Sequence, residues 1–586
     1  MILLHETTRE FIFATKRNRL HMRFQICENL PVKCRIIYWN RFHKNDVFSL
    51  DVPCLGQDGY RKYYECDIDF DETVSYIQYY FELEINGKTA YWGRNGYDSQ
   101  KPAYFFEYLA TAELDLIEVP EWAKGTVWYQ IFPERFLNGN KVNDPADIAA
   151  WDEVPTRENF FGGDLAGIIR NMPYLKDLGV DVIYMTPIFA AITNHKYDTV
   201  DYFKIDPSFG TLADFKKLVS VCHELEIKVV LDGVFNHIGY YSQQFQDVIE
   251  KGKDSCYADW FYIKGFPIET NPLNYECVGY HQWMPKLKMK TRAVRDFFVE
   301  VGRYWLEECD IDGWRLDVAD EIDFTFLQEF RREIKAVRPD AFLLAETWKD
   351  GRDMLRGDQV DSVMNYLFRD AVIDFFAKRK ISAASFGQRI SQMLFGYSKA
   401  VRPVLYNTIG SHDTARFLTV CQGDLVRLKL ALGFQMAFPG MPAIYYGDEI
   451  GMDGENDPDC RKAMAWDKAD KNLLDFVKRL TSLRKEFPCL KYGDFKCLYA
   501  HEAVFAFTRS FQTETALVII NNSEKTHQAR IPLWESKEEI AEMKTVFKYD
   551  SIELETLYNH ESFGSKPVFE MELNQFHFEI IKIRRN

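Results

Sequence analysis

The sequence predicts a multidomain α/β protein, in which a central (β/α)8 TIM barrel lies between an N-terminal and a C-terminal β-sandwich. Two observations predict it. Between about residues 121 and 489, short apolar segments alternate with amphipathic segments of helical period. Residues 1–120 and 490–586 consist instead of strand-like segments separated by turn-forming residues. A chain of 586 residues is long enough for about three or four domains.

The first 120 residues have the composition of strands throughout. HMRFQI, KCRIIYW and SYIQYYFELEI are rich in β-branched and aromatic residues, and LGQDG and INGK between such segments are typical of turns. We therefore expect a β-sandwich, followed by a linker at VPEWAKG.

Eight short apolar runs supply the strands of the predicted barrel. They are residues 127–132, 181–186, 228–235, 313–318, 341–346, 361–365, 403–410 and 442–449. Helical segments separate most of them, for example 212–227 and 291–308. The connection after the third strand is unusually long, so we expect residues 238–290 to form a small inserted subdomain. Beyond residue 490, VFAFTRSF and TALVIINN return to the pattern of strands.

Composition excludes several classes of partner. The net charge of −16 repels phosphate backbones and anionic lipids, which argues against nucleic acid and membrane partners. No run of 18 apolar residues occurs, and the start, MILLHETTREF, lacks the pattern of a signal peptide. The 12 cysteines are scattered without a CxxC pair. These features lead us to expect a cytoplasmic protein with free thiols.

Polar residues end the predicted barrel strands, and the carboxyl ends of barrel strands meet at one rim. The strand ends carry Asp232, Asn236 and His237 (third), Arg315 and Asp317 (fourth), Glu346 (fifth), and His412 and Asp413 (seventh), while His195, Tyr197 and Asp198 follow the second strand. A polar residue at any single strand end is explained by a role as the cap of the next helix. Several ionisable groups at one rim are expensive to bury together and favour a catalytic site.

The positions of three of these residues suggest roles. Arg315 and Asp317 are two residues apart on one strand and share a face, so we expect the guanidinium to lower the pKa of Asp317 and keep it ionised as a nucleophile. Glu346 ends an apolar strand, and partial burial favours the protonated form that a general acid needs. Carboxyls on adjacent strands suit the roughly 5–5.5 Å separation of retaining glycosidases.

Several motifs resemble those of a known family. DGVFNH, GWRLDVADE, AETW and IGSHDTARF resemble, in order, the four main regions of the α-amylase superfamily, glycoside hydrolase family 13, and MTPIF resembles its strand-two region. MPKLK, VWYQIFPERFLNGN and the all-β N-terminal segment resemble the neopullulanase, cyclomaltodextrinase and maltogenic amylase subfamily. The resemblance implies a retaining hydrolase that cleaves α-1,4 bonds of cyclodextrins, maltodextrins and pullulan. Cleavage of α-1,6 bonds and transglycosylation stay open.

The resemblance also assigns roles to individual residues. It implies Asp317 as nucleophile, Glu346 as acid/base and Asp413 as the residue that stabilises the transition state. The substrate-binding residues that it implies are Tyr197, His237, Arg315, Trp348, His412, Asp457 and Arg461. For Asp457 and Arg461, a structural ion pair explains the motif equally well. Asp232 and Asn236 are assigned mainly to scaffolding.

One oxygen-rich region resembles the calcium site of the subfamily. The residues that carry this resemblance are Asn138, Asn140, Asn143, Asp144, Gly162 and Asp164. Oxygen ligands suit a hard cation such as Ca²⁺. Asn140 stands where the family usually has an aspartate, which removes a negative charge, so a metal-free turn is the alternative.

Two other functions were weighed against the hydrolase. One is an α-glucosidase or glucan transferase on the same barrel. The other is a non-catalytic sugar-binding relative, which the presence of all three carboxylates disfavours. The resemblance also implies a homodimer, in which the N-terminal domain narrows the entrance to a partner's active site and favours cyclodextrins over starch. The aromatic-rich residues 76–110 offer apolar surface for such packing, although they would serve equally as the core of their own sandwich.

Overall fold

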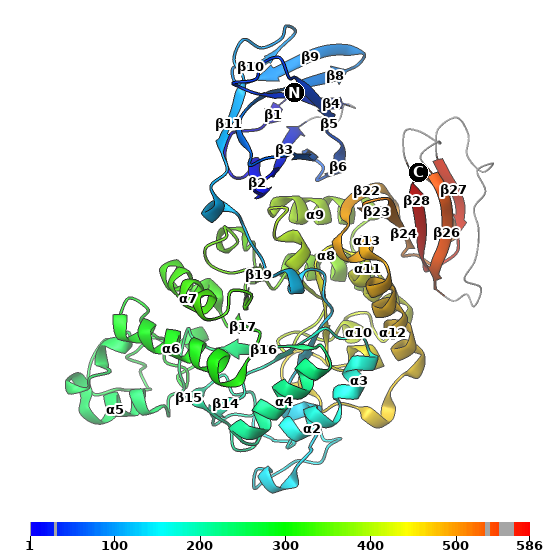
Figure 1. The fold of residues 1–586 in the computed structure, drawn as a ribbon. Helices are drawn as coiled ribbons and strands as arrows, with labels where there is room; N and C mark the ends of the chain where they lie inside the picture. The colour runs from blue at the N-terminus through cyan, green and yellow to red at the C-terminus, as the bar shows by residue number, and fades with distance from the viewer. Residues whose placement is uncertain (1, 28–31, 534–539, 550–567, 586) are drawn as a thin grey trace. The chain divides into compact units, whose positions relative to one another are not determined.

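The computed structural model describes residues 2–27, 32–533, 540–549 and 568–585. The chain forms two compact units, coloured along the sequence in Figure 1. One consists of Val119–Arg379 and Pro403–Tyr492, and the other of Met1–Glu118, Lys380–Arg402 and Gly493–Asn586. Parts of both predicted end domains, including 534–539 and 550–567, lie outside the described residues.

The first unit contains a barrel of eight parallel strands. In chain order they are β12 (Trp128–Ile131), β13 (Val182–Met185), β16 (Lys228–Gly233), β17 (Gly313–Leu316), β18 (Phe342–Ala345), β19 (Ser362–Val363), β20 (Tyr406–Thr408) and β21 (Met441–Tyr445). Their order in the sheet is β19-β18-β17-β16-β13-β12-β21-β20. A parallel bridge between Met364 and Tyr406 joins the two end strands and closes the barrel. The predicted fold class is therefore confirmed.

Helices connect these strands. They are α1 (Pro133–Phe136), α2 (Leu165–Arg170), α3 (Met172–Asp177), α4 (Leu212–Glu224), α6 (Arg292–Cys309), α7 (Phe324–Val337), α8 (Tyr366–Val372), α10 (Phe417–Val420), α11 (Leu425–Ala437), α12 (Lys471–Glu486) and α13 (Pro488–Tyr492). Helix α4 begins at a capping box, in which Thr211 and Asp214 satisfy each other's backbone N–H groups. Helix α6 buries one side, including Phe298 and Trp305. The amphipathic pattern of the sequence thus marks the faces that cover the barrel.

The barrel strands stop where the polar residues begin. Every residue of β17 and β18 is buried, and the ladders end one residue before Asp317 and Glu346. At their carboxyl ends, the runs predicted from the sequence are longer than the observed strands, because they include the polar residues that directly follow each strand. The carboxyl rim of the barrel therefore carries the ionisable side chains.

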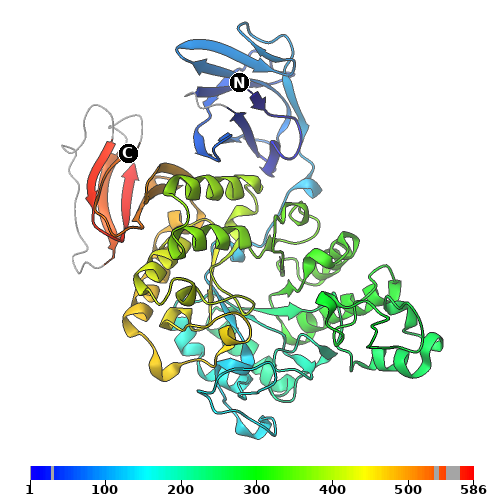
Figure 2. The ribbon, with the colours of Figure 1, turned by 180° about the vertical axis from the view of Figure 1, so that it is seen from behind.

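The long third connection forms an inserted region on the barrel unit. It contains α5 (Gln243–Lys251), and an antiparallel bridge from His237 to Lys286 joins its two ends. A second antiparallel bridge, from Cys277 to Pro285, lies within its C-terminal part. A separate hairpin, β14 (Phe189–Ala191) and β15 (Thr199–Ile205), follows β13. The inserted region projects from the barrel in both Figure 1 and Figure 2.

The second unit is mainly β. Its N-terminal part has two antiparallel sheets built from β1 (Ile2–Leu4), β2 (Ile12–Lys16), β3 (Arg19–Cys27), β6 (Cys54–Gln57) and β7 (Lys62–Asp69), and from β4 (Val32–Asn40), β5 (Phe48–Asp51), β8 (Ser75–Ile85), β9 (Lys88–Gly93), β10 (Gly96–Asp98) and β11 (Phe106–Ala110). Side chains from both sheets, among them Phe24, Tyr79 and Phe81, form one buried core. Much of the aromatic segment 76–110 thus fills the core of its own sandwich.

The C-terminal part of this unit has one five-stranded and one two-stranded sheet. The strands are β22 (Asp494–His501), β23 (Val504–Phe511), β24 (Glu514–Asn521), β28 (His577–Arg585) and β26 (Ile540–Lys548), and the pair β25 (His527–Pro532) and β27 (Val568–Leu573). Buried apolar residues from both sheets, including Leu517, Ile531 and Ile581, form a common core.

Residues 380–402 belong to this second unit, although the sequence-based limits place them in the barrel domain. Helix α9 (Ala383–Gly396) contacts β6 at one end of the chain and β22 and β23 at the other. Next to it, Arg402 binds Glu65 through two contacts of 2.6 Å. Lys399 binds both Asp67 (2.7 Å) and Asp494 (2.9 Å). This segment therefore joins strands that lie more than 400 positions apart in the sequence.

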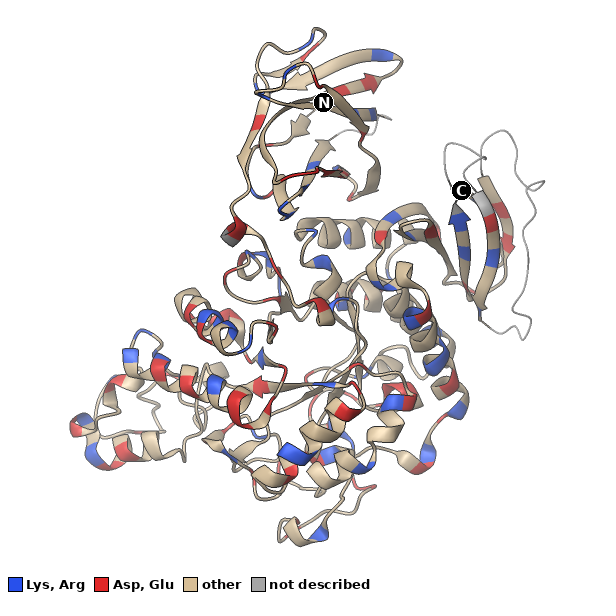
Figure 3. Ribbon diagram, viewed as in Figure 1, with Lys and Arg blue, Asp and Glu red and all other residues tan. Residues whose placement is uncertain are grey.

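Charge is distributed in small alternating groups. On the barrel unit, acidic and basic residues alternate along the helices in Figure 3. Within the described ranges, no helix has both the length and the hydropathy needed to cross a membrane. All 12 cysteines are free thiols.

Candidate active site

Arg315 lies at the centre of the ionisable cluster on the carboxyl rim. Its guanidinium is fully buried, and Nη1 lies 2.9 Å from Asp232 Oδ1 and 2.8 Å from Asp317 Oδ1. Nη2 lies 2.8 Å from Glu346 Oε2. The parallel register explains this arrangement, because Arg315 pairs with Asp232 of β16 on one side and with Leu344 of β18 on the other. One cation therefore holds the predicted nucleophile and the predicted acid together.

The electrostatics of Asp317 differ from the expectation drawn from the sequence. Burial raises the pKa of Asp317 well above its ordinary value, Arg315 opposes this shift, and the neighbouring Glu346 and Asp232 reinforce it. Arg315 does lower the pKa of Asp317, as expected, but burial outweighs this effect, so the expected net lowering of the pKa is wrong. The sequence showed the guanidinium, but it did not show how completely the aspartate is buried beside two further carboxylates.

Two N–H groups hold the carboxylate of Glu346. The backbone N–H of Val318 donates to Oε2 (2.8 Å), and the indole N–H of Trp348 donates to Oε1 (3.2 Å). Val318 follows the predicted nucleophile and has φ = 46°, a left-handed conformation that a β-branched residue rarely adopts. This local strain is of the kind that collects at functional sites. It turns the amide of Val318 toward the predicted acid.

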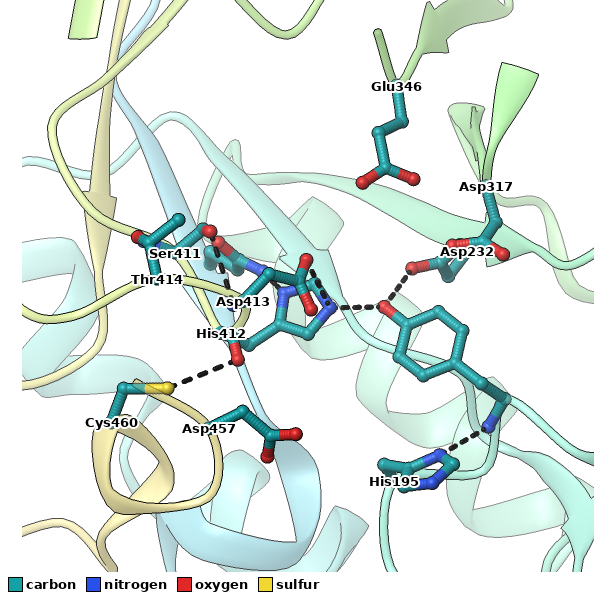
Figure 4. A network of polar contacts seen from close by, with 12 residues as sticks. His195, Asp232, Asp317, Glu346, Ser411, His412, Asp413, Thr414, Asp457 and Cys460 are labelled. Carbon is teal, nitrogen blue, oxygen red and sulfur yellow. Dashed lines mark hydrogen bonds and ion pairs between the residues drawn. The ribbon is translucent and has the colours of Figure 1, made fainter. Parts of the chain in front are cut away.

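A chain of hydrogen bonds fixes Tyr197 and His412 in the site. The side-chain amide of Gln130 donates to His412 Nδ1 (2.6 Å), so the ring proton of a neutral His412 is on Nε2. Nε2 then donates to the hydroxyl of Tyr197 (2.6 Å), which donates to Asp232 (2.9 Å). Figure 4 shows His412, Asp232, Asp317, Glu346 and Asp413 gathered at this place. The network connects Gln130 of β12 and Asp232 of β16 with side chains from the loops before β15 and after β20.

Both histidines of the predicted site are neutral. Burial, with Arg461 and Arg315 nearby, lowers the pKa of His412 well below its ordinary value. Burial also lowers the pKa of His237 to about 4, although a hydrogen bond to the backbone of Tyr197 opposes it. His237 donates through Nε2 to the Tyr197 carbonyl (3.0 Å), and its buried Nδ1 has no partner within the described chain. Nδ1 is therefore an acceptor that a hydroxyl group can use.

The carboxylate of Asp413 lies in the site beside the side chains of Arg461 and His412. It lies 3.3 Å from Arg461 Nη2 and 3.2 Å from His412 Nε2. Burial raises the pKa of Asp413, while Arg461 opposes the shift. Arg461 also binds Asp457 (2.9 Å), so the predicted pair Asp457–Arg461 is present as an ion pair. Asp457 in turn lies 3.4 Å from Arg157.

Trp348 is the most exposed of the predicted catalytic and substrate-binding residues. Half of its surface is exposed, and its ring stacks on that of Tyr366 at a centroid distance of 4.1 Å. An exposed indole face beside a carboxylate offers apolar surface to a sugar ring.

The structure thus brings all ten predicted catalytic and substrate-binding residues to one rim of the barrel unit. Their individual roles remain predictions. Sequence reasoning missed three residues that hold them, Gln130, Val318 and Tyr366, and also Tyr184, which binds the neighbouring Asp232. Gln130 offered a signal, because it is a polar residue inside an apolar strand. The strained backbone of Val318 has no counterpart in the sequence pattern.

The six predicted calcium ligands also lie together, around Asp164. The carboxylate of Asp164 accepts the backbone N–H groups of Gly139 (3.0 Å), Asn140 (2.7 Å) and Gly167 (2.6 Å). The side-chain oxygen of Asn140 accepts the N–H of Val142 (3.2 Å). Asp164 and Asn140 therefore use their oxygens on the loop itself.

The remaining candidates are better suited to a cation. The buried amide oxygens of Asn138 and Asn143 have no hydrogen-bond partner in the described part of the chain. Asn138 Nδ2 donates to Asp144 Oδ1 (2.6 Å), and a Cβ on Gly162 would lie within 2.7 Å of both side chains. Unpaired amide and carboxylate oxygens are the ligands that Ca²⁺ prefers. Asn138, Asn143 and Asp144 therefore fit the ion.

Comparison with known proteins identifies the class of this fold and site. The family profile described as the alpha amylase catalytic domain matches residues 130–472, the N-terminal ig-like domain matches 1–112, and the C-terminal domain matches 493–555. The match to the catalytic domain spans the closed parallel barrel and the carboxylates on its rim, and it identifies the chain as a glycoside hydrolase. The chain belongs to the α-amylase family, glycoside hydrolase family 13.

Similar proteins share most of the length of the chain. A cyclomaltodextrinase of Thermoanaerobacter pseudethanolicus is 48% identical over 551 residues, which are 92% of this chain and 96% of that protein. Neopullulanase 2 of Thermoactinomyces vulgaris is 40% identical, with coverage of 89% and 90%. A solved cyclomaltodextrinase structure superposes with a TM-score of 0.89 at 35% identity and covers 99% of each chain.

Proposed function

We propose that the protein hydrolyses α-1,4-glucosidic bonds of cyclodextrins, short maltodextrins and pullulan with retention of the anomeric configuration. The observation that carries this proposal is the single guanidinium of Arg315, which contacts both Asp317 and Glu346 at 2.8 Å. Two carboxyls held this closely fit a double displacement better than the wider spacing of an inverting site. The similar cyclomaltodextrinases, maltogenic amylase and neopullulanase support the substrate class.

In this mechanism, a carboxylate oxygen of Asp317 attacks the anomeric carbon as Glu346 gives its proton to the leaving glycosidic oxygen. The bond to the leaving sugar breaks, and a glycosyl ester on Asp317 forms. Glu346, now ionised, removes a proton from water, whose oxygen displaces Asp317 and restores both carboxyls. The N–H groups of Val318 and Trp348 keep the Glu346 carboxylate in place during both steps.

The neutral residues orient the sugar. His237 offers Nδ1 as a buried acceptor, and Tyr197 presents a ring fixed by His412. Asp413 supplies a carboxylate for sugar hydroxyls and for the positive charge that develops on the ring.

Stereochemistry and substrate preference test the proposal. NMR of the first-formed product should show the α-anomer from an α-linked substrate, and an initial β-anomer would refute a double displacement. The ratio of kcat/KM for β-cyclodextrin to that for soluble starch should exceed one. A clear preference for starch would leave the general hydrolase and remove the cyclodextrin preference.

We further propose one structural Ca²⁺ held by Asn138, Asn143 and Asp144. The two unpaired buried amide oxygens support it. The ion would supply positive charge that holds the loop, and no chemical step requires it.

We also propose a cytoplasmic homodimer. A Bacillus subtilis relative described as an intracellular maltogenic amylase is 44% identical over 419 residues, which supports the location. Exposed apolar side chains in the N-terminal sandwich, including Phe42 in a turn and Phe48 on β5, support self-association. Sedimentation equilibrium tests the dimer, and a monomer at micromolar concentration would refute it.

A further inference from the structure

The inserted region carries two exposed aromatic rings that the proposed reaction does not use. Tyr241 is 53% exposed and Trp283 is 46% exposed. Their rings are nearly parallel, with an interplanar angle of 11° and a centroid distance of 6.1 Å. They come from opposite ends of the inserted region, more than 40 positions apart in the sequence. The two rings therefore present large, nearly parallel apolar faces at the surface of the inserted region.

The rest of the inserted region holds this pair in place. The ring of Tyr240 packs edge-on against both Tyr241 and Trp283 and also contacts the fully buried Phe245. The backbone N–H of Tyr240 donates to the carbonyl of Trp283 (2.9 Å). Because the pair rests on a buried core and on a backbone ladder, its orientation is fixed before any ligand arrives.

The polar edges of both rings are available. In the described chain, neither the hydroxyl of Tyr241 nor the indole N–H of Trp283 makes a hydrogen bond. An aromatic face with an unused polar group at its edge suits a sugar, which presents an apolar C–H face bordered by hydroxyls. A buried protein partner would instead require far more apolar surface than two rings provide.

The ring pair is continuous with the active site. His237 faces Lys286, Ile238 N–H donates to the Pro285 carbonyl (3.1 Å), and Tyr240 follows on the same ladder. Tyr240 lies three positions after His237, which is about 10 Å along an extended chain. Lys286 also binds Glu321 (2.7 Å), four residues after Asp317. The ladder and this ion pair connect the rings to the site of bond cleavage.

We propose that Tyr241 and Trp283 form a glucan-binding platform for sugar units beyond those held at the cleaved bond. The inference rests on the proposed hydrolysis of α-glucans and extends it to longer linear chains. A short substrate ends before it reaches the platform, whereas a longer maltodextrin contacts both the carboxylates and the rings.

The first test compares chain lengths. Trp283→Ala and Tyr241→Ala should each raise KM for maltoheptaose by about 3- to 10-fold, the effect of losing one aromatic contact, with kcat nearly unchanged. Both constants for maltotriose should stay within roughly twofold of wild type. The matched control is Phe266→Ala, an aromatic residue of the same region that is 43% exposed and has no ring partner in the described chain. Equal losses on both substrates, or an equal loss in the control, would overturn the platform.

A second measurement separates the platform from the reaction. In a Glu346→Gln background, calorimetric titration with maltoheptaose should show about 3- to 10-fold weaker binding when Trp283→Ala is added. Trp283→Phe keeps an aromatic face and should retain most of the affinity, which covers the case in which the alanine variant fails to fold. If the wild-type protein hydrolyses no α-glucan yet binds maltoheptaose through these rings, the proposed function fails and the platform stands. Unchanged binding in Trp283→Ala overturns the platform alone.

Discussion

Arg315 carries one positive charge and contacts three carboxylates, those of Asp232, Asp317 and Glu346. If all three carboxylates were ionised, the buried cluster would have a net charge of about −2 and no solvent around it. Such a charge would be costly in free energy. Burial accordingly raises the pKa of Asp232 and of Asp317, against the effect of Arg315, so that a bound proton on these coupled carboxyls is favoured. Double displacement needs this composition, with one carboxyl protonated as acid and one ionised as nucleophile.

Replacing Asp317 tests the role of the nucleophile. Asp317→Asn keeps the shape of the side chain but removes the attacking oxygen anion, so turnover of β-cyclodextrin should fall about 10³-fold or more. The circular dichroism spectrum should match that of the wild-type protein. Asp323→Asn, at an exposed carboxylate six residues further along, is the control and should retain activity. Near-normal turnover in Asp317→Asn would remove the assignment.

At this scale, sequence reasoning located the predicted site residues but not their environment. Asp317, Glu346 and His412 were identifiable because each follows an apolar run that must end at the barrel rim. The raised pKa of Asp317 was not, since burial beside Asp232 and Glu346 depends on strand register. The left-handed backbone of Val318 is equally invisible, because valine normally argues against it.

Among the elements, the short 3-10 helix η11 (Asp448–Ile450) that follows β21 contains an unusual carboxyl. Glu449 is fully buried and accepts hydrogen bonds from the hydroxyls of Tyr129 (2.8 Å) and Tyr174 (2.7 Å). Burial raises the pKa of Glu449 to about 7, against the effect of these two hydrogen bonds. The folded state therefore binds a proton that the unfolded state releases above about pH 4.5.

Glu449→Gln should change how stability depends on pH. A raised pKa in the folded state means that the wild-type protein loses stability as pH rises from about 4.5 to about 7, by about 3 kcal/mol in total. The glutamine keeps an oxygen acceptor but has no charge to bury. Chemical denaturation should thus show the variant stabilised at pH 8 and nearly unchanged at pH 4.5. An equal effect at both values would contradict the titration of Glu449.

The loop from Asn138 to Asp144 provides a second element-scale prediction. If Ca²⁺ binds there, EDTA should lower the Tm and added Ca²⁺ should restore it, because a ligand of the folded state alone stabilises that state. The initial rate on β-cyclodextrin, measured well below the Tm, should stay within roughly twofold. Asn143→Ala should abolish the effect of Ca²⁺ on Tm. Immediate loss of activity in folded protein on chelation would instead indicate a catalytic metal.

Secondary structure was readable from the sequence where one residue pattern determines one element. The eight barrel strands and helices such as α4 and α6 follow directly from apolar runs and helical period. The assignment of α9 to the second unit could not be read in this way. Its amphipathic pattern shows that one face is buried, but not that the partners are β6 and β22 at opposite ends of the chain.

At the scale of the whole molecule, the second unit depends on buried charge. Although burial opposes it, Arg402 lowers the pKa of Glu65 to about 2. A lowered pKa means that the pair stabilises the unit above about pH 4.5 and that this contribution is lost as pH falls toward 2. Acid should therefore weaken the attachment of residues 380–402 to the N-terminal strands.

Glu65→Gln tests this dependence at neutral pH. The variant leaves the buried guanidinium of Arg402 without its partner, which should cost about 3–5 kcal/mol in the free energy of unfolding. The control is Glu84→Gln, at an exposed ion pair with Lys33 on the neighbouring sheet, which should cost less than about 1 kcal/mol. The double variant Glu65→Leu/Arg402→Met should recover much of the loss, since no charge remains buried. Equal stability of Glu65→Gln and wild type would show that the pair contributes little.

The route of the chain through this unit also limits how such a protein can be recombined. Its parts are encoded in three places, before the barrel, within it and after it. If residues 1–118 alone were exchanged between two relatives, the surface that packs against α9 would come from a different protein. Glu65 would be separated from its own partner, Arg402. A working chimera would have to exchange residues 380–402 and the strands after residue 493 as well. A single crossover in the gene therefore cannot transfer this structural unit, whether in natural recombination or in protein engineering.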